Sequence, residues 1–376
     1  MKLTMTTQQF VLPEGHDYFG NCHASTVAAL PGGRLRVAWF AGEKEGSGDT
    51  AIWLACAEQG RWLPPVRIAW EDGLAHWNPV LHQQAGKLWL FYKVGADVHH
   101  WQTRVMVSTD DGASWSAPCP LVPGDSAPRG PVKNKLLVMS NGEWLAPASV
   151  EDDRHWDAFV DLSGDQGRNW QAVPIPLTHR IPGDEGGGAL WQGLEQAALW
   201  ENDLTRVFQW DGVIQPSAWE STPGRVHVLI RSTRGVLYRS DSDDYGRRWR
   251  EAYAIDLPNN NSGVDLAHLG AGRLVLVYNP VTGNWRHRYP LTVACSVDNG
   301  EHWENRIDLE QEPGEFSYPA IIADGDTVNA GGAASHAGGT TSHAGGTTSH
   351  AGGTTLHVTY TWNRKNIVYC ALIFSG

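Results

Sequence analysis

An eight-residue pattern, Ser-x-Asp-x-Gly-x-x-Trp, occurs four times in this chain of 376 residues. The copies occupy residues 108–115, 163–170, 242–249 and 296–303. Successive copies begin 55, 79 and 54 residues apart, and such a sustained spacing indicates a fold built from repeated units. The segment that ends Gly60-Arg61-Trp62 looks like a degenerate fifth copy.

Each copy predicts a β-hairpin for local reasons. An apolar strand enters the pattern, as in Arg-Val-Met-Val before Ser108. The Asp side chain can accept backbone N–H groups inside the turn, and the Gly supplies a positive φ. The Trp starts the returning strand and covers the turn with its ring. Because a step near 50 residues fits one four-stranded blade, the repeats predict an all-β protein of the propeller type.

We expect residues 1–376 to form a single propeller domain with two insertions. The 79-residue step leaves room for one insertion, around residues 181–192. Residues 329–355 hold the second, a low-complexity tract that contains SHAGGTT three times and cannot bury apolar surface. This tract separates AIIADGDTV from LHVTYTWNR, which we predict to be two strands of one hairpin. Its regularly spaced histidines are better explained by repeat expansion than by metal binding, so we predict no metal and no cofactor.

Composition excludes several classes of function. The net charge is −12 and no cluster of Lys and Arg occurs, which argues against a nucleic-acid partner. No run of 18 apolar residues occurs, so we predict no membrane span. The five cysteines are odd in number and widely spaced, which argues against a disulfide framework and structural zinc. We expect a cytoplasmic protein, although a secreted chain without its leader would look the same.

The four repeats are Asp boxes, and in blades of this length they resemble those of the sialidase superfamily, the BNR-repeat proteins. The resemblance covers about residues 21–373 and implies a six-bladed β-propeller. Sialidases hold a sugar carboxylate with three arginines, and they use an Asp as acid/base and a Tyr nucleophile partnered by a Glu. Arginine suits this task because its planar fork matches a carboxylate. A Tyr can attack an anomeric carbon without bringing two anions together.

Three segments resemble parts of that site. WESTPGRVHVLIRST matches a family strand pair, which implies a substrate-binding role for Arg231 and brings Glu220 close to the site. The stretch before the last Asp box implies a second arginine at Arg288, with Arg286 as the alternative. The segment Glu-Phe-Ser-Tyr-Pro puts Tyr318 in the place of the nucleophile.

Two further carboxylates complete the catalytic candidates. Glu315, three residues before the tyrosine, could face the same pocket or cap a turn. Asp49 lies where the family carries its acid/base residue, with Glu43 and Glu45 nearby in the sequence.

The chain departs from the family pattern at two positions. His23 stands in place of the first arginine, and a histidine does not replace a bidentate guanidinium. Gln215, five residues before Glu220, stands where the Glu that partners the tyrosine is expected, and an amide cannot act as a base. These departures imply a site rebuilt for another acidic sugar or another chemistry.

Other polar runs could line the central axis and bind a carbohydrate, because amides bond to hydroxyls. The run RGPVKNK supplies cations near a turn, where they would repel one another without an anion. The run NNNSGVD and the segment HWNP supply amides, although Asn and Gly also simply make turns. The substrate-binding candidates from these runs are Arg129, Lys133, Lys135, Asn260, Asp265 and Asn78.

Three functions fit these residues. The first is an exo-acting glycoside hydrolase on an acidic sugar. Arg231, Arg288 and Arg129 would bind the carboxylate, and we expect an anionic carbohydrate as partner. The second is a uronate polysaccharide lyase, in which His23, His76 and Tyr318 move protons and no Glu is needed at position 215. The third is a carbohydrate-binding propeller without catalysis. The sugar, the linkage and the oligomeric state are left open by the sequence.

Overall fold

A computed structural model of the chain describes residues 2–180, 201, 203, 206–324 and 353–375. The prediction of an all-β protein is confirmed, because the described residues contain β-strands and one short 3₁₀ helix, η1 (Arg206–Phe208), but no α-helix. The described part of the chain also contains no helix long and apolar enough to cross a membrane. The predicted insertions around 181–192 and over 329–352 lie outside the described residues, whereas residues 353–355 begin a strand.

In the described part of the chain, the strands form five sheets. The first contains β2 (Asn21–Leu30), β3 (Arg34–Gly42), β4 (Ala51–Glu58), β5 (Arg61–Trp62) and β6 (Val66–Ala69). The second contains β7 (His76–Gln84), β8 (Lys87–Val94), β9 (Gln102–Ser108) and β10 (Cys119–Pro120). The fourth contains β19 (Asp265–His268), β20 (Leu274–Tyr278), β21 (Leu291–Ser296) and β22 (Glu304–Glu310).

The third sheet is longer and joins two antiparallel groups. Its first group is β11 (Leu137–Val138), β12 (Trp144–Glu151), β13 (His155–Ser163) and β14 (Gln171–Pro174). Its second group is β15 (Asp211–Thr222), β16 (Arg225–Ser232), β17 (Val236–Ser242) and β18 (Tyr253–Pro258). The two groups meet through a short parallel pairing of β13 with β15, at His155–Asp211 and Trp156–Gly212, so the sheet pairing alone does not give a blade count.

The fifth sheet brings the two ends of the chain together. It contains β23 (Phe316–Ala323), β24 (Gly353–Trp362), β25 (Asn366–Ser375) and β1 (Lys2–Phe10). The N-terminal strand β1 pairs antiparallel with the C-terminal strand β25. The predicted hairpin across the low-complexity tract is confirmed, because β23 and β24 are antiparallel neighbours.

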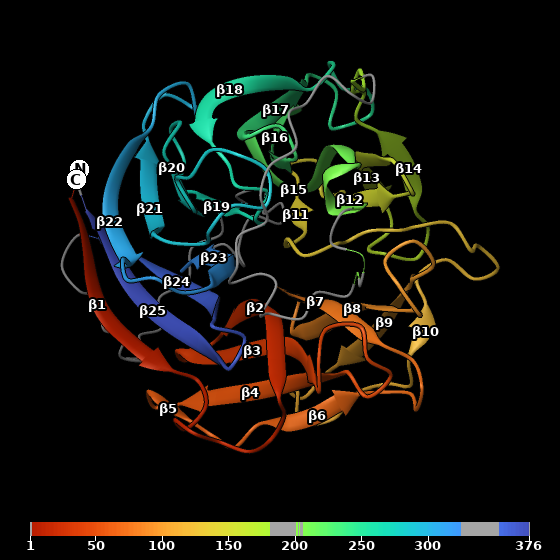
Figure 1. The fold of residues 1–376 in the computed structure, drawn as a ribbon, viewed down its shortest axis with the longest axis vertical. Coiled ribbons are helices and arrows are strands. Elements are labelled where there is room, and N and C mark those ends of the chain that lie inside the picture. Colours follow the sequence, from red (N-terminus) through yellow and green to blue (C-terminus); the bar gives the residue numbers. More distant parts are fainter. Residues whose placement is uncertain (1, 181–200, 202, 204–205, 325–352, 376) are drawn as a thin grey trace, which may run out of the picture.

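The sheets are arranged around a common centre, with β2, β7, β11, β15, β19 and β23 innermost (Figure 1). The apolar core lies between the faces of neighbouring sheets. One large cluster, for example, packs β20 and β21 against β23, β24 and β25 through residues such as Val293 and Leu372, both fully buried. This burial supplies the main favourable free energy of such a fold, at roughly 25 cal/mol per Å² of apolar surface.

The predicted hairpins at the four Asp boxes are confirmed. Each box joins two antiparallel strands: β9 and β10, β13 and β14, β17 and β18, and β21 and β22. In the last box, the Ser296 Oγ accepts the Gly300 N–H at 2.9 Å, and Asp298 Oδ1 accepts the His302 N–H at 2.9 Å. Gly300 has φ +83°, which explains the glycine. The degenerate copy at Gly60 is also a hairpin, between β4 and β5.

The innermost strands share a backbone irregularity. Ala24, Asn78, Gln215 and Tyr318 each have a positive φ, between 40° and 58°, inside a register shift of β2, β7, β15 or β23. Two residues with φ of 68° and 62°, Lys133 and Asn261, lie four residues before β11 and β19. A left-handed backbone is costly for residues other than glycine, by roughly 1–3 kcal/mol, and is typical of functional sites.

Candidate functional site

A pocket opens where these irregular strand segments approach the centre of the molecule. Asn78, Gln215 and Tyr318 line it directly, as do residues from several other connections. The lining residues are Glu45, Trp77, Asn78, Val98, Trp101, Glu151, Trp156, Ile214, Gln215, Arg231, Trp285 and Tyr318. Because a bulge with positive φ turns a strand residue out of its sheet, the repeated irregularity explains why these positions reach the pocket.

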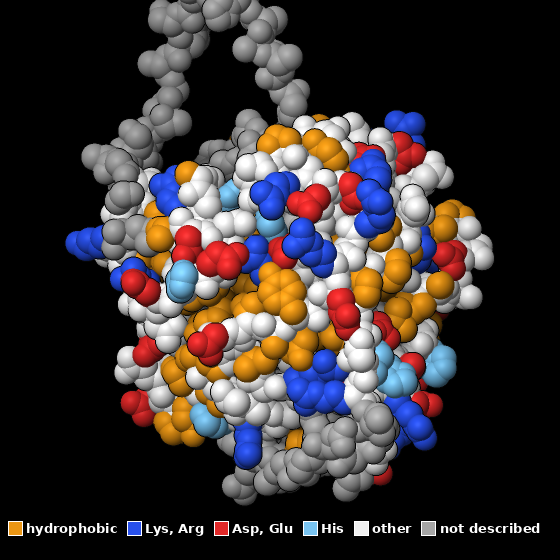
Figure 2. Space-filling model, turned by 90° about the horizontal axis from the view of Figure 1, so that it is seen from above, with side chains coloured by type: hydrophobic (Ala, Val, Ile, Leu, Met, Phe, Trp, Pro, Cys, Tyr) orange, Lys and Arg blue, Asp and Glu red, His pale blue; other side chains and the backbone are white. Residues whose placement is uncertain are grey.

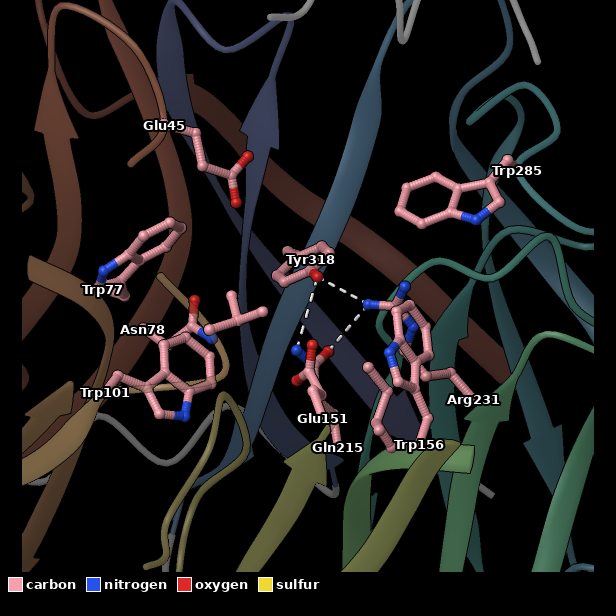
Figure 3. A pocket seen from close by; sticks show the side chains of 12 residues that line it. Glu45, Trp77, Asn78, Trp101, Glu151, Trp156, Gln215, Arg231, Trp285 and Tyr318 are labelled. Carbon is pink, nitrogen blue, oxygen red and sulfur yellow. Dashed lines mark hydrogen bonds between the residues drawn. The ribbon is translucent and has the colours of Figure 1, made fainter. Parts of the chain in front are cut away.

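Arg231, Tyr318 and Gln215 form a hydrogen-bonded triangle in the pocket (Figure 3). Arg231 Nη1 donates to the Tyr318 hydroxyl at 2.6 Å and to Gln215 Oε1 at 3.1 Å. Gln215 Nε2 donates to the same tyrosine hydroxyl at 3.5 Å. The structure therefore brings together three of the residues singled out from the sequence, from β16, β23 and β15.

The guanidinium of Arg231 is buried and has no ion pair with a described carboxylate. Its remaining donors go to Asn261: Nε to Oδ1 at 3.1 Å, and Nη2 to Oδ1 at 2.8 Å and to the backbone carbonyl. Only 2% of Arg231 is exposed. A buried cation held by neutral acceptors favours an anion nearby, in a bound ligand or on a neighbouring group.

Arg288 is engaged differently, because the protein supplies its anion. Arg288 Nη1 donates to Glu315 Oε1 at 2.6 Å, and Arg364 Nε donates to both oxygens of Glu315 at 3.1 and 3.0 Å. Arg364 Nη1 also donates to Glu45. Burial alone would raise the pKa of Glu315, but Arg364 and Arg288 hold it below its ordinary value. Two of the buried arginines are thus neutralised internally, and neither lines the pocket.

The ring of Tyr318 is surrounded by nitrogen groups. His23 lies 4.2 Å away between ring centroids, and Arg231, Arg288 and Lys133 lie 5.6, 5.7 and 5.9 Å from the centroid of Tyr318. Burial, followed by the charges of Arg364, Arg288, Arg231 and Lys133, holds the pKa of His23 well below its ordinary value, so this histidine is neutral. The site therefore carries a neutral imidazole where the family resemblance implies an arginine.

Lys133 binds the backbone next to the tyrosine. Its Nζ donates to the carbonyls of Pro319 and Val264, at 2.6 and 2.7 Å. Burial lowers the pKa of Lys133 to about 7; Lys135 and Arg231 lower it further, whereas Asp265 opposes the shift. This side chain fixes the segment that carries Tyr318, and does not line the pocket.

Several predicted residues lie away from the pocket. Asp49 is exposed, and it holds its own loop by accepting the Glu43 N–H at 2.9 Å and the Ser47 hydroxyl. Arg129 pairs with Asp161 at 3.0 Å, and Glu220 accepts the Ser140 N–H at 2.6 Å.

The two candidates from the NNNSGVD run have structural partners. Asn260 donates to the His287 carbonyl at 2.7 Å. Asp265 accepts from Lys135 at 2.9 Å and from the Ser217 hydroxyl at 2.6 Å, which links neighbouring sheets. Neither side chain lines the pocket.

Two carboxylates in the pocket were not among the main sequence candidates. Glu45 was named only as a sequence neighbour of Asp49, and Glu151, the last residue of β12, carried no signal because it lies in no motif. Burial raises the pKa of Glu151 to about 7; Glu45 raises it further, while Arg231 and Lys93 oppose the shift. The Oε1 atom of Glu151 is buried and has no hydrogen-bond partner among the described residues.

Four tryptophans form the walls of the pocket. Trp77 and Trp101 meet edge to face at 5.8 Å on one side, and Trp156 and Trp285 meet at 6.3 Å on the other (Figure 3). Trp156 also lies 5.5 Å from the Arg231 guanidinium. Aromatic walls with a few convergent polar groups are typical of small-ligand sites. A sequence signal existed only for Trp77, which precedes Asn78.

Comparison with known proteins identifies the family. The family model for the BNR repeat-like domain matches residues 33–330. The chain belongs to this family, within the sialidase superfamily. This BNR-repeat protein is 23% identical over 304 residues to a sialidase of Bacteroides fragilis, which covers 76% of the chain. The matched part is only 47% of that curated relative, so the chain spans about half its length.

Solved structures support the same fold at low identity. The Hadza microbial sialidase Hz136 matches with a TM-score of 0.69 and 16% identity, covering 97% of this chain and 68% of that one. A protein of unknown function from Dyadobacter fermentans matches with 0.66 and 13%, covering 99% of both chains. Trypanosoma rangeli sialidase matches with 0.63 and 13%, covering 95% of this BNR-repeat protein and 55% of the sialidase.

Proposed function

We propose that the protein is a glycoside hydrolase that removes a terminal sugar bound in the central pocket, with Tyr318 as the nucleophile. The observation that carries this proposal is the contact of the Tyr318 hydroxyl with Arg231, at 2.6 Å, in a pocket walled by tryptophans and containing two carboxylates. The guanidinium favours negative charge on the tyrosine oxygen as it attacks. The sialidase relatives support the same reaction class.

The sugar would carry an acidic group that meets Arg231. Arg231 is the one arginine among the described pocket-lining residues, and its charge lacks a carboxylate partner. Arg288 already binds Glu315, so we infer a single-arginine contact in place of the three-arginine clamp of sialidases. The tryptophan walls would pack against the C–H faces of the sugar, and Asn78 and Gln215 would bond to its hydroxyls.

The frame of this site would be a six-bladed propeller. The residues with positive φ at 24, 78, 133, 215, 261 and 318 occur once in or before each antiparallel group of strands. This regular occurrence supports counting the long third sheet as two blades.

A panel of acidic and neutral aryl glycosides tests the proposed reaction. Release of the aryl alcohol is expected from acidic glycosides and not from matched neutral ones, and Arg231→Met should lose that preference. Failure to cleave any member of the panel would contradict the proposal.

The contact between His23 and Tyr318 favours a uronate lyase as the second candidate. Elimination leaves an unsaturated sugar that absorbs ultraviolet light, whereas hydrolysis does not. Ultraviolet spectra of products from a polyuronate therefore separate the two reactions.

A further inference from the structure

Glu151 stands out among the buried titratable groups because it lines the pocket and the protein gives its side chain little to bind beyond the Ser149 hydroxyl. It is 7% exposed, lines the pocket, and has a buried Oε1 atom without a hydrogen-bond partner among the described residues. A buried polar atom without a partner costs roughly 1–3 kcal/mol, which a bound ligand can recover. The free oxygen therefore points to an interaction that forms only with substrate.

The other acidic side chain of the pocket is already engaged. Glu45 accepts from Arg364, and this guanidinium also holds Glu315. This ion pair occupies the Glu45 carboxylate, which leaves it less free to contact a ligand. The amide of Gln215 can neither give nor take a proton around neutral pH. Among the described side chains that line the pocket, Glu151 is thus the acid with a free oxygen.

We propose that Glu151 donates the proton to the leaving-group oxygen of the glycoside and later takes a proton from the attacking water. This assignment rests on the proposed function. Nothing in the sialidase-like motifs points to it, because Glu151 ends strand β12 and lies outside every segment that carries the resemblance.

The steps balance with water as the only co-reactant. The O–H bond of Glu151 breaks as its proton bonds to the glycosidic oxygen, which takes the electron pair of the breaking C–O bond. The Tyr318 oxygen bonds to the anomeric carbon, and its own proton passes to solvent water. A water oxygen then bonds to that carbon and gives a proton to the Glu151 carboxylate, while the Tyr318 oxygen leaves and recovers a proton from water.

The charged groups around Glu151 fit this cycle. Arg231 from β16 and Lys93 from β8 favour its carboxylate, whereas Glu45 from the β3–β4 connection favours its acid form. Burial is the largest effect and keeps the pKa near 7, so both protonation states are accessible around neutral pH. A group that donates a proton and regains one in every catalytic cycle must have both its acid and its carboxylate form accessible.

Leaving-group dependence provides the test, because a purely structural role would not change it. Glu151→Gln is expected to lower kcat/KM on alkyl glycosides by about 10²–10⁴-fold, and on dinitrophenyl glycosides by less than about tenfold. The decline of kcat/KM above pH 7 should also disappear in this variant. Azide should restore turnover of the dinitrophenyl substrate by Glu151→Ala, because azide needs no base.

Matched variants separate the possible results. Glu45→Gln should keep the wild-type leaving-group dependence, and the exposed Glu58→Gln is the control for charge removal. An equal loss on both substrates in Glu151→Gln, or a retained alkaline decline, overturns the role of Glu151 while the hydrolase function stands. A wild-type protein that cleaves neither substrate overturns both.

Discussion

The Asp-box turns at the outer hairpins and the irregular segments at the centre are both repeated structures, but they differ in what they repeat. The four turns repeat both backbone and side chains: in each, a Ser Oγ accepts a Gly N–H at 2.8–3.0 Å. The central segments repeat the positive φ but carry Ala, Asn, Lys, Gln, Asn and Tyr.

This difference separates stability from chemistry. A turn that must satisfy its own N–H groups needs the same side chains in every copy. A bulge at the centre only has to aim a side chain, so each copy is free to supply a different group. The face of the protein in Figure 2 mixes acidic and basic side chains, so that face carries no field of one sign.

The largest expected effect comes from the central tyrosine. Tyr318→Phe should lower kcat by at least about 10³-fold, since it removes the proposed nucleophile. The melting temperature should change little, because Arg231 keeps its bonds to Gln215 and Asn261. Tyr253→Phe, on the Asp-box hairpin β17–β18, is the matched control and should retain activity. Wild-type turnover in Tyr318→Phe would be incompatible with a tyrosine nucleophile.

The pH dependence of stability should reveal the buried acid. Burial raises the folded-state pKa of Glu151 to about 7, above its ordinary value of 4.5. The unfolded chain therefore loses this proton first, so the stabilisation is complete below pH 4.5 and is lost as pH rises through 7. Relative to Glu151→Gln, the wild type should lose up to about 3 kcal/mol of unfolding free energy over this range. Denaturant unfolding at several pH values measures this difference in unfolding free energy. If the free energies of both proteins changed with pH in parallel, the pKa of Glu151 would not be raised by folding.

An Asp-box substitution should lower stability and leave activity nearly unchanged, the reverse of what we expect for Tyr318→Phe. Ser296→Ala leaves the Gly300 N–H without its acceptor, and should destabilise the protein by about 1–3 kcal/mol. Activity at 25 °C should stay within about twofold of wild type, because the turn is remote from the pocket. Thermal unfolding and kcat measure the two effects, with the exposed Ser126→Ala as control. A large loss of activity without a loss of stability would contradict the view that the Asp-box turns serve stability and the central segments serve chemistry.

The smallest effect should be the acid titration of the Asp boxes. Hydrogen bonds from Ser114 lower the pKa of Asp110 to about 2, and hydrogen bonds from Asn169 do the same for Asp165. Because these values lie below the ordinary 3.8, the associated stabilisation is present above pH 4 and is lost as pH falls through 2. Carboxyl NMR titration should find both midpoints near 2 in the folded protein. Midpoints near 3.8 would show that the turn bonds contribute little.

The repeated octamer was enough to predict the hairpins and the all-β fold, because a turn of this kind is defined by contacts within eight residues. The resemblance also led to Arg231, Tyr318 and Gln215, which meet in the pocket. The family strand patterns include these positions, so the local sequence was enough to predict them as site residues. Three of the central residues, Asn78, Gln215 and Tyr318, directly precede a proline, a regularity that could have marked the irregular segments.

Only the tertiary structure decided which charges face the pocket. Glu315 and Asp49 looked alike in sequence as carboxylates near family motifs, yet one binds Arg288 and Arg364 and the other holds an exposed loop. Glu151 lies outside every motif, but packing between sheets buries it beside Arg231 and leaves one oxygen free. By itself, the sequence determined the repeated hairpins, because their bonds are local. The protonation and pairing of the central groups depend on burial and on partners up to 319 residues away, as in Arg364 and Glu45, which no local pattern records.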